Sequence, residues 1–423
     1  MNNPLQAFMD VRRGEWPLAL SMFCYFFLVI TSFWILKPLK KGLFIEFYDV
    51  DGFALAGISF TAAQAELLAK VLNMVVALLA VVVFSWLSLR LRRQQLSFAF
   101  AGFFIVCYFL FAGWLVQPAG GAVWSFYLFG DLFSTLMVAT FFAFLNDAVY
   151  PGTAKRLYGL VGLGGVAGGV LGATVVRVNS DSLDYGDWLN VCTVLAVLIV
   201  LAAWSAGRHV EVPLAPAAAE PEKPQHSPAT EGARLVFRSP SLLSIVAIVG
   251  LYEVISTIMD FQFTATIAHY LSGPEIGAQF ALVFSNTNWV SLLVQLFLTG
   301  FVMSRFGIGI ALLVLPCAIA MGSSAFLLFP MLWMGSLLNT VDNGFSYSIN
   351  QSAKEALYVP TSSAEKYRAK AFIDMFVQRF AKAVAVVISL GLTFAFSDFD
   401  SIRYLSLITL VLLVVWVIAA RYA

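Results

Sequence analysis

The chain has 423 residues, of which 60% are apolar and only 12% charged, and its formal net charge is +1. Soluble domains carry about 45–50% apolar and about 25% charged residues, so this composition excludes a soluble globular enzyme and a disordered chain. The near-neutral charge gives no reason to expect a nucleic-acid partner. The composition instead indicates a protein that lies in a lipid bilayer.

Long apolar segments recur along the chain, each near the length of about 20 residues that a helix needs to cross a bilayer. They are too long and too continuous for the alternating strands of a membrane barrel. The sequence therefore predicts an all-α polytopic membrane protein with twelve transmembrane helices. The predicted spans are 17–37, 67–89, 96–116, 122–149, 156–178, 187–206, 241–270, 278–303, 307–329, 331–350, 368–396 and 401–420.

A proline-punctuated segment at 207–240 is the one clear linker, because its mixture of small and charged residues cannot bury a core. It divides the chain into an N-terminal six-helix half at 1–206 and a C-terminal six-helix half at 241–423. We expect the linker and both termini in the cytoplasm of a bacterium, since this orientation places most connecting Lys and Arg residues inside. The chain is then a multi-pass protein of the inner membrane.

The two halves resemble distant repeats. The segment TAKRLYGLVG at 153–162 and the segment RAKAFIDMFV at 368–377 each place Ala-Lys before an apolar helix, and the two lysines are 215 residues apart. Parallel six-helix repeats around a central linker are typical of major-facilitator transporters. The predicted fold is therefore of the major-facilitator type.

The fifth span is rich in glycine. It contains Gly164, Gly168 and Gly172 at intervals of four, which predicts a face for close packing against another helix. A dinucleotide-binding loop is excluded because no strand precedes these glycines. The four cysteines lie in apolar runs without metal-ligand spacing, so we expect buried thiols, no metal and no cofactor.

Ionisable residues inside the membrane cost about 2.5–3.5 kcal/mol each and usually line a pathway or pair with one another. The seventh, eighth and tenth helices carry polar residues at helical spacing, which indicates one polar face on each helix. These stripes are Glu253, Ser256, Thr257, Asp260 and Thr264; Asn288, Ser291 and Gln295; and Asn339, Asp342, Asn343, Ser346 and Asn350. We predict that they face a wet central cavity; hydrogen bonds between helices are the alternative.

Two groups of cations lie at helical positions. Arg379 and Lys382 share one face of the eleventh helix, and we expect them to bind an anion such as Asp342, Asp260 or a substrate phosphate. A structural ion pair is the alternative. The first helix is predicted to end at Lys37, Lys40 and Lys41, where Pro38 should distort it; these lysines would then be interfacial anchors or substrate contacts.

Two stretches resemble the ATP/ADP translocase family of plastids and intracellular bacteria. The first, DLFSTLMVATFFAFLNDAVYPGTAKRLYGLVGLGG at 131–165, has an acid opening its helix, an Asn-acid pair near its end, and then Ala-Lys-Arg before a glycine-rich run. The second, KEALYVPTSSAEKYRAKAFIDMFVQRFAK at 354–382, resembles the family's Lys-Glu-x-x-Tyr-x-Pro segment and the helix after it. Matching residues are Asp131, Asn146, Asp147, Ala154, Lys155, Arg156, Tyr158, Lys354, Glu355, Tyr358, Pro360, Lys370, Ile373, Asp374 and Arg379.

The resemblance implies functional roles for two lysines and two acids. The matching positions in this chain are Lys40, Asp131, Asp260 and Lys354, with aspartates standing where the family has glutamates. Pro38 and Lys41 are further departures, because the family tends to have acids beside its first-helix lysine. By this resemblance we expect the chain to move ATP, ADP or similar phosphorylated anions.

We therefore predict a secondary transporter, not an enzyme, that works by alternating access and by exchange. Its partners are a nucleotide or another phosphorylated small molecule and the bilayer, and we expect a monomer. The predicted substrate-binding residues are Lys40, Asp131, Glu253, Asp260, Asp342, Lys354, Arg379 and Lys382. A proton-coupled carrier of a non-nucleotide solute, with Glu253 and Asp260 as proton sites, is the alternative; an intramembrane enzyme or a receptor is a remote one.

Overall fold

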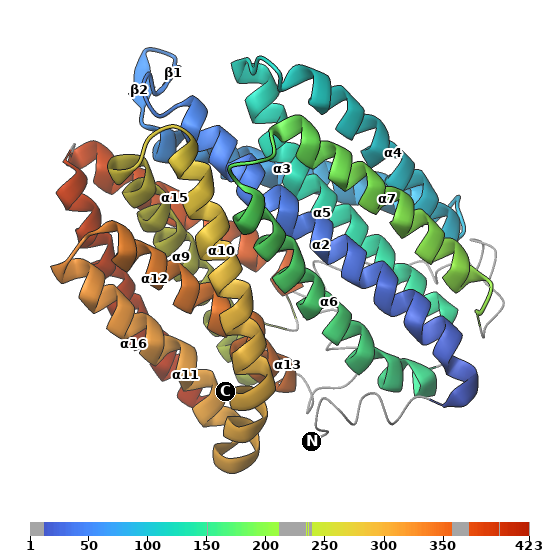
Figure 1. The fold of residues 1–423 in the computed structure, drawn as a ribbon. Helices are drawn as coiled ribbons and strands as arrows, with labels where there is room; N and C mark the ends of the chain where they lie inside the picture. The colour runs from blue at the N-terminus through green and yellow to red at the C-terminus, as the bar shows by residue number, and fades with distance from the viewer. Residues whose placement is uncertain are drawn as a thin grey trace. The chain divides into compact units, whose positions relative to one another are not determined.

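The computed structural model describes residues 12–149, 151–210, 234, 236, 239–357, 372–396 and 398–422. Figure 1 shows a chain that is almost entirely helical, which agrees with the predicted all-α membrane protein. Most of the predicted linker at 207–240 lies outside the described residues. So do Tyr358, Pro360 and Lys370, together with the side chains of Ala154, Lys155, Arg156 and Asp374.

Long helices make up the first part of the chain, with one short hairpin between the first two. The hairpin strands β1 (Phe53–Leu55) and β2 (Ile58–Phe60) are antiparallel, and Phe53 pairs with Phe60. A short 3₁₀ turn at Arg13–Glu15 precedes the first helix. The helices are α2 (Trp16–Phe47), α3 (Ala62–Ser88), α4 (Arg93–Trp114), α5 (Gly120–Ala148), α6 (Pro151–Asn179) and α7 (Tyr185–Gly207).

The second part of the chain continues the helical pattern but contains π-helical segments. The α-helices are α9 (Pro240–Tyr270), α10 (Pro274–Leu293), α11 (Gly300–Leu328), α12 (Leu332–Phe345), α13 (Gln351–Leu357), α15 (Gln378–Ala395) and α16 (Leu405–Tyr422). The π-helical segments are η2 (Val294–Thr299), η3 (Ser346–Asn350) and η4 (Ile373–Val377). A 3₁₀ turn, η5 (Phe399–Tyr404), precedes α16.

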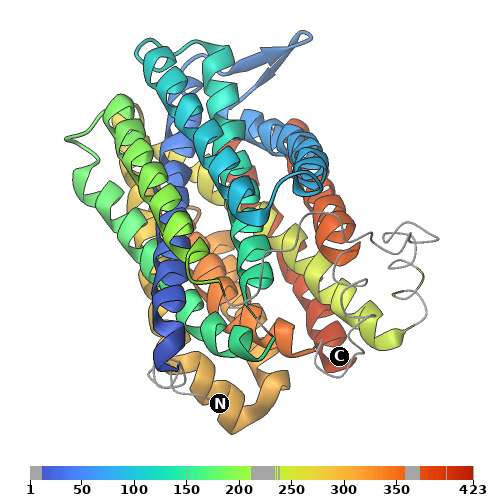
Figure 2. The same ribbon diagram turned by 90° about the vertical axis from the view of Figure 1, so that its right-hand side faces the viewer.

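Two compact units divide the chain. Unit 1 contains the described residues within Met1–Gly52, Leu72–Ala219 and Gly273–Asn288. Inside it, α2 packs against α5, α6 and α7, and α4 packs against α5 and α7, as Figures 1 and 2 show. Helix α7 begins at a side-chain cap, in which Asp184 Oδ1 accepts a hydrogen bond from the Asp187 backbone N–H at 2.8 Å.

Unit 2 contains the described residues within Phe53–Val71, Glu220–Ser272 and Trp289–Ala423. Its centre is α9, which packs against α12, α15 and α16, while α11 packs against α12 and α16. Helix α3 therefore contributes its first ten residues to unit 2 and the rest to unit 1, and α10 is divided in the same way at Asn288. The predicted division at the linker 207–240 stays a prediction.

Ten described helices are long and apolar enough to cross a membrane. One of the ten is the continuous stretch Pro274–Leu328, which covers two predicted spans and leaves helical geometry at Gly307 (φ 82°). Glycine adopts this positive φ without a steric penalty. The predicted span at 331–350 corresponds to α12 followed by η3, which is too short as an α-helix to be among the ten. The prediction of twelve is therefore consistent with the structure.

The first helix extends further than its composition indicates. The predicted span 17–37 is too short, because α2 continues through Pro38 to Phe47. Proline removes one backbone donor, and the neighbouring turns keep the helix continuous. Lys40 and Lys41 are each only 5% exposed, so they lie inside the helix packing and are not interfacial anchors at a helix end.

The glycine-rich face of α6 packs as predicted. A Cβ added to Gly164 would lie 2.9 Å from the Phe23 carbonyl oxygen of α2, and one added to Gly172 would lie 2.5 Å from the Thr31 carbonyl oxygen. Gly168 meets the Phe27 carbonyl oxygen between them. Because backbone cannot move aside like a flexible side chain, only glycine permits this approach of the two helices.

Candidate functional site

A lysine cluster, defined here as Lys37, Lys40 and Lys41 on α2, lies in unit 1. The Lys40 ammonium forms an ion pair with Asp131 of α5 and lies 4.4 Å above the centre of the Tyr127 ring. The side chain of Lys40 is 6% exposed and that of Asp131 is 27% exposed. The structure therefore brings together two of the residues that the family resemblance singles out.

The ammonium groups of the other two lysines of the cluster lie near aromatic rings. The Lys37 ammonium lies 4.4 Å from the Trp34 ring centre and 4.7 Å from the Phe284 ring centre. The Lys41 ammonium lies 5.2 Å from the Phe280 ring centre. Ring faces stabilise a cation without neutralising it. The lysine cluster thus places three positive groups on α2, one of them paired with Asp131.

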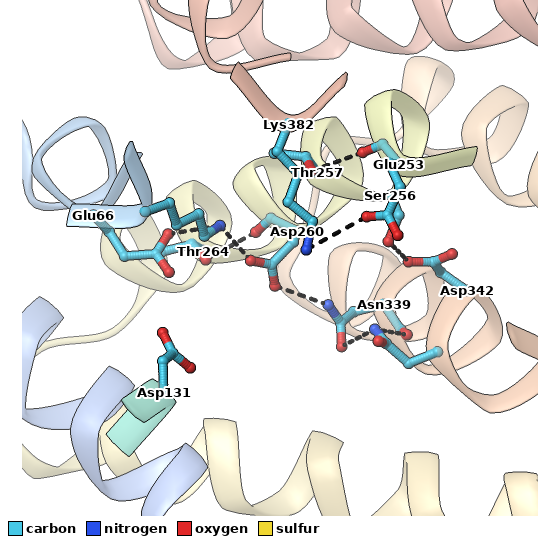
Figure 3. A network of polar contacts seen from close by, with 12 residues as sticks. Glu66, Asp131, Glu253, Ser256, Thr257, Asp260, Thr264, Asn339, Asp342 and Lys382 are labelled. Atoms are coloured by element: carbon cyan, nitrogen blue, oxygen red, sulfur yellow. Dashed lines mark hydrogen bonds and ion pairs between the residues drawn. The ribbon is translucent and has the colours of Figure 1, made fainter. Parts of the chain in front are cut away.

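The polar stripe of α9 forms the centre of a second group in unit 2. We call Glu66, Glu253, Asp260 and Asp342 the carboxylate network (Figure 3). Lys70 of α3 lies 2.5 Å from Asp260 Oδ2 and 3.0 Å from Glu66 Oε2. The Asn339 side chain of α12 donates to Asp260 Oδ1 at 3.3 Å. Asp260, the second acid of the resemblance, therefore joins three helices.

The rest of the network lies further along α9. Lys382 of α15 pairs with Glu253 Oε2 at 3.5 Å, so its partner is Glu253 and not Asp342 or Asp260. Ser256 donates its hydroxyl to Asp342 Oδ2 at 2.6 Å. The Asp342 side chain is fully buried, and its Oδ1 has no hydrogen-bond partner among the described residues. Four carboxylates and two ammonium groups thus meet in the network and its partners.

The remaining predicted residues lie on neighbouring segments. Arg379 is one turn before Lys382 on α15 and is partly exposed. Lys354 lies on α13 and makes no ion pair or hydrogen bond within the part of the chain that the structure describes. The predicted face of α12 holds for Asn339 and Asp342, but Ser346 and Asn350 belong to the π-helical segment η3, which changes the helical spacing.

Sequence reasoning missed Glu66 and the bonding role of Asn73. The predicted second span begins at 67, whereas α3 begins at Ala62, so Glu66 lies inside the helix and is 0% exposed. Glu66 lies four residues before Lys70, and this spacing could have predicted their ion pair from the sequence. Asn73 donates to Asp131 Oδ2 at 2.9 Å, and it lies one turn after Lys70.

The described residues contain no group of three or more His, Cys, Asp and Glu side chains placed to hold a metal ion. The charged side chains of both groups offer ionic interactions. Ammonium groups can bind phosphate oxygens, and carboxylates can accept hydrogen bonds, exchange protons or neutralise the lysines when no substrate is bound.

Two curated proteins that this chain resembles are ADP,ATP carriers. The ADP,ATP carrier protein 1 of Chlamydia pneumoniae is 23% identical over 98% of this chain and 93% of its own length. The chloroplastic ADP,ATP carrier protein 1 of Arabidopsis thaliana is 23% identical over 71% of this chain. The match covers 54% of that plant protein, so the chain spans about half the length of this relative.

A solved structure shows the same fold. The crystal structure of the nucleoside transporter NupG superposes with a TM-score of 0.65 and 16% sequence identity, covering 96% of this chain and 99% of that protein. The major-facilitator-type fold is therefore shown. A sequence model of the TLC ATP/ADP transporter family matches residues 114–333 and 321–422, which is well over half of the chain. The chain belongs to the TLC ATP/ADP transporter family.

Proposed function

We propose that this protein exchanges ATP and ADP, or closely similar nucleotides, across a membrane by alternating access. The observation that carries the proposal is the family match over 114–333 and 321–422. The lysine cluster supports it, because three ammonium groups at neighbouring positions of one helix suit a multiply charged phosphate.

Lys40 has the central role in binding. Between turnovers its charge is balanced by Asp131, and an incoming phosphate takes the place of that carboxylate. Lys37 and Lys41 add positive potential from the same helix. Lys354, Arg379 and Lys382 are the proposed cations of the second half, with Arg379 offering a planar fork to phosphate oxygens.

The acids Glu253, Asp260 and Asp342 are assigned to the base, the ribose or the balance of charge. A carboxylate accepts hydrogen bonds from the amino and hydroxyl groups of a nucleoside. Asp260 is 25% exposed at its side chain and keeps Lys70 and Asn339 as neighbours, so it remains accessible to such a group.

A second candidate function is proton-coupled transport. It is favoured by the four carboxylates of the carboxylate network and by the full burial of Asp342 beside a neutral donor, Ser256. A buried carboxylate without a matched cation is costly when ionised. This function requires that an imposed proton gradient drive uptake into vesicles that contain no nucleotide.

We place the protein in a bacterial cytoplasmic membrane as a monomer with both termini inside. The lysine and arginine distribution supports this orientation. The halves 1–206 and 241–423 would then rock about the substrate while the segment 207–240 connects them on the cytoplasmic side.

A competition experiment tests the substrate class. Purified protein in liposomes loaded with ADP should take up labelled ATP, and excess unlabelled ADP should abolish the uptake. Adenosine at the same concentration should inhibit weakly, because it offers no phosphate to the lysine cluster. Equal inhibition by adenosine and ADP would contradict a site built for phosphate.

A further inference from the structure

One polar face of α3 carries Glu66, Lys70 and Asn73. Glu66, Lys70 and Asn73 are four and three residues apart, so they follow one another along the same side of the helix. Lys70 bonds to Asp260 in unit 2, and Asn73 bonds to Asp131 in unit 1. Lys70 was not among the predicted substrate-binding residues.

The two ion pairs of Lys70 differ in kind. Its pair with Glu66 lies within a single helix, at 3.0 Å and a spacing of four residues, so it survives any rigid movement of α3. Its pair with Asp260 joins α3 to α9, at 2.5 Å, so it depends on where these helices lie relative to one another. Only the second pair can break when the helices move.

Exposure separates the two carboxylates in the same way. The Glu66 side chain is 0% exposed, while those of Asp260 and Lys70 are 25% and 21% exposed. Lys70 thus has one partner that is fully buried and one that is partly exposed.

We propose that Lys70 is a further phosphate-binding residue, and that a substrate phosphate replaces Asp260 as its partner during transport. Glu66 is the positioning residue: it keeps Lys70 oriented and charged after Asp260 leaves. The exchange of partners also explains how binding is linked to helix movement, since the phosphate releases a contact between α3 and α9. This inference rests on the proposed nucleotide transport and adds a binding residue to it.

Competition at Lys70 is physically reasonable. A terminal phosphate carries more charge than a carboxylate and offers several acceptor oxygens to one ammonium. Breaking the Lys70–Asp260 pair without a replacement would give up an ion pair in a membrane interior, which is unfavourable. A phosphate supplies that replacement at Lys70, and the Asn339 side chain continues to donate to Asp260.

The test compares binding of ATP, ADP, AMP and adenosine to purified variants in nanodiscs. Lys70→Gln should weaken ATP binding by roughly 10- to 100-fold, the range for losing a charge-assisted hydrogen bond, and should leave adenosine binding close to that of the wild type. Lys70→Arg should retain most of the ATP affinity. Glu66→Gln should also weaken ATP binding, though less than Lys70→Gln, because Lys70 loses the carboxylate that keeps it oriented and charged.

The double variant Lys70→Gln/Asp260→Asn separates binding from structure. It removes both charges of the interhelical pair, so it should recover the thermal stability that Lys70→Gln alone loses, without recovering ATP affinity. Arg403→Gln is the matched control, since it breaks the exposed Arg403–Asp400 pair at 2.8 Å and should leave ATP binding unchanged.

Recovery of ATP affinity in the double variant would overturn the proposal and make Lys70 a structural partner of Asp260. Wild-type ATP affinity in Lys70→Gln would overturn it as well. If Lys70→Gln does not fold, Lys70→Arg and the double variant still decide the question. If the wild-type protein binds no nucleotide at all, the proposed function fails and this inference fails with it.

Discussion

Lys40 carries an ammonium group into the interior of unit 1, and its charge has to be balanced there. Asp131 provides the balance, and Asn73 holds Asp131 through its other carboxylate oxygen. A substrate that binds Lys40 must offer at least as much negative charge as it displaces.

Neutralising Lys40 alone should harm both stability and transport. In Lys40→Gln the Asp131 carboxylate loses its ionic partner, while Lys40→Gln/Asp131→Asn removes both charges together. We expect a coupling free energy of about 1–3 kcal/mol between the two sites in thermal or denaturant unfolding, with ATP transport absent from both variants. Full transport by the double variant would show that the pair serves only the fold.

The sequence could predict these residue types but not their partners. Lys40, Asp131 and Asp260 follow from the family resemblance, because their positions along the helices match it. That Lys382 pairs with Glu253, and that Glu66 belongs to α3, depends on packing between helices far apart in the chain. The burial of Glu66 could not be predicted from the sequence, because the apolar run begins just after this residue.

Contacts between α2 and α6 are the tightest element-scale feature of unit 1. Three glycines of α6 meet three carbonyl oxygens of α2 that are spaced four residues apart, so the helices touch through their backbones. This contact positions α2 and therefore the lysine cluster. Its glycine spacing is local in sequence, which is why it could be predicted before the structure was available.

Adding one methyl group to this contact should push the helices apart. We expect Gly168→Ala to lower the thermal midpoint of the purified protein, because the new Cβ would overlap the Phe27 carbonyl oxygen. Gly162→Ala is the matched control: it lies on the same helix, and nothing lies within 4 Å of its added Cβ. Alanine favours helix by about 1 kcal/mol over glycine, so the control should be neutral or stabilised. Equal midpoints for the two variants would contradict the packing account.

The π-helical segments show where element-level prediction stops. The segments η2, η3 and η4 each rotate the helix that follows. Polar residues that a constant helical spacing places on one face therefore no longer share that face beyond the segment. The extension of α2 past Pro38 is a similar case. Tertiary packing decides both features, and the local sequence does not encode them.

At the scale of the whole molecule, composition was sufficient to predict a helical membrane protein. The apolar runs at 187–206 and 241–270 correspond closely to α7 and α9, because a bilayer demands long apolar helices. The division of α3 and of α10 between the two units could not be predicted. It depends on how helices from distant parts of the chain pack.

Orientation in the membrane can be checked by labelling. In a variant without Cys24, Cys107, Cys192 and Cys317, a single cysteine placed within 207–240 should react only with reagents that reach the cytoplasm. Ala56→Cys in the turn between β1 and β2 is the matched control and should report the opposite side. Labelling of the linker from the periplasmic side would contradict the predicted topology.

The most direct test of nucleotide exchange is the dependence of uptake on the substrate inside the vesicle. Purified protein is reconstituted into liposomes that either contain ADP or are empty, and labelled ATP is added outside with the pH gradient collapsed. Exchange predicts rapid ATP uptake into the loaded vesicles and almost none into the empty ones. Equal uptake into both, or uptake that disappears when the pH gradient is collapsed, would contradict exchange and favour proton coupling.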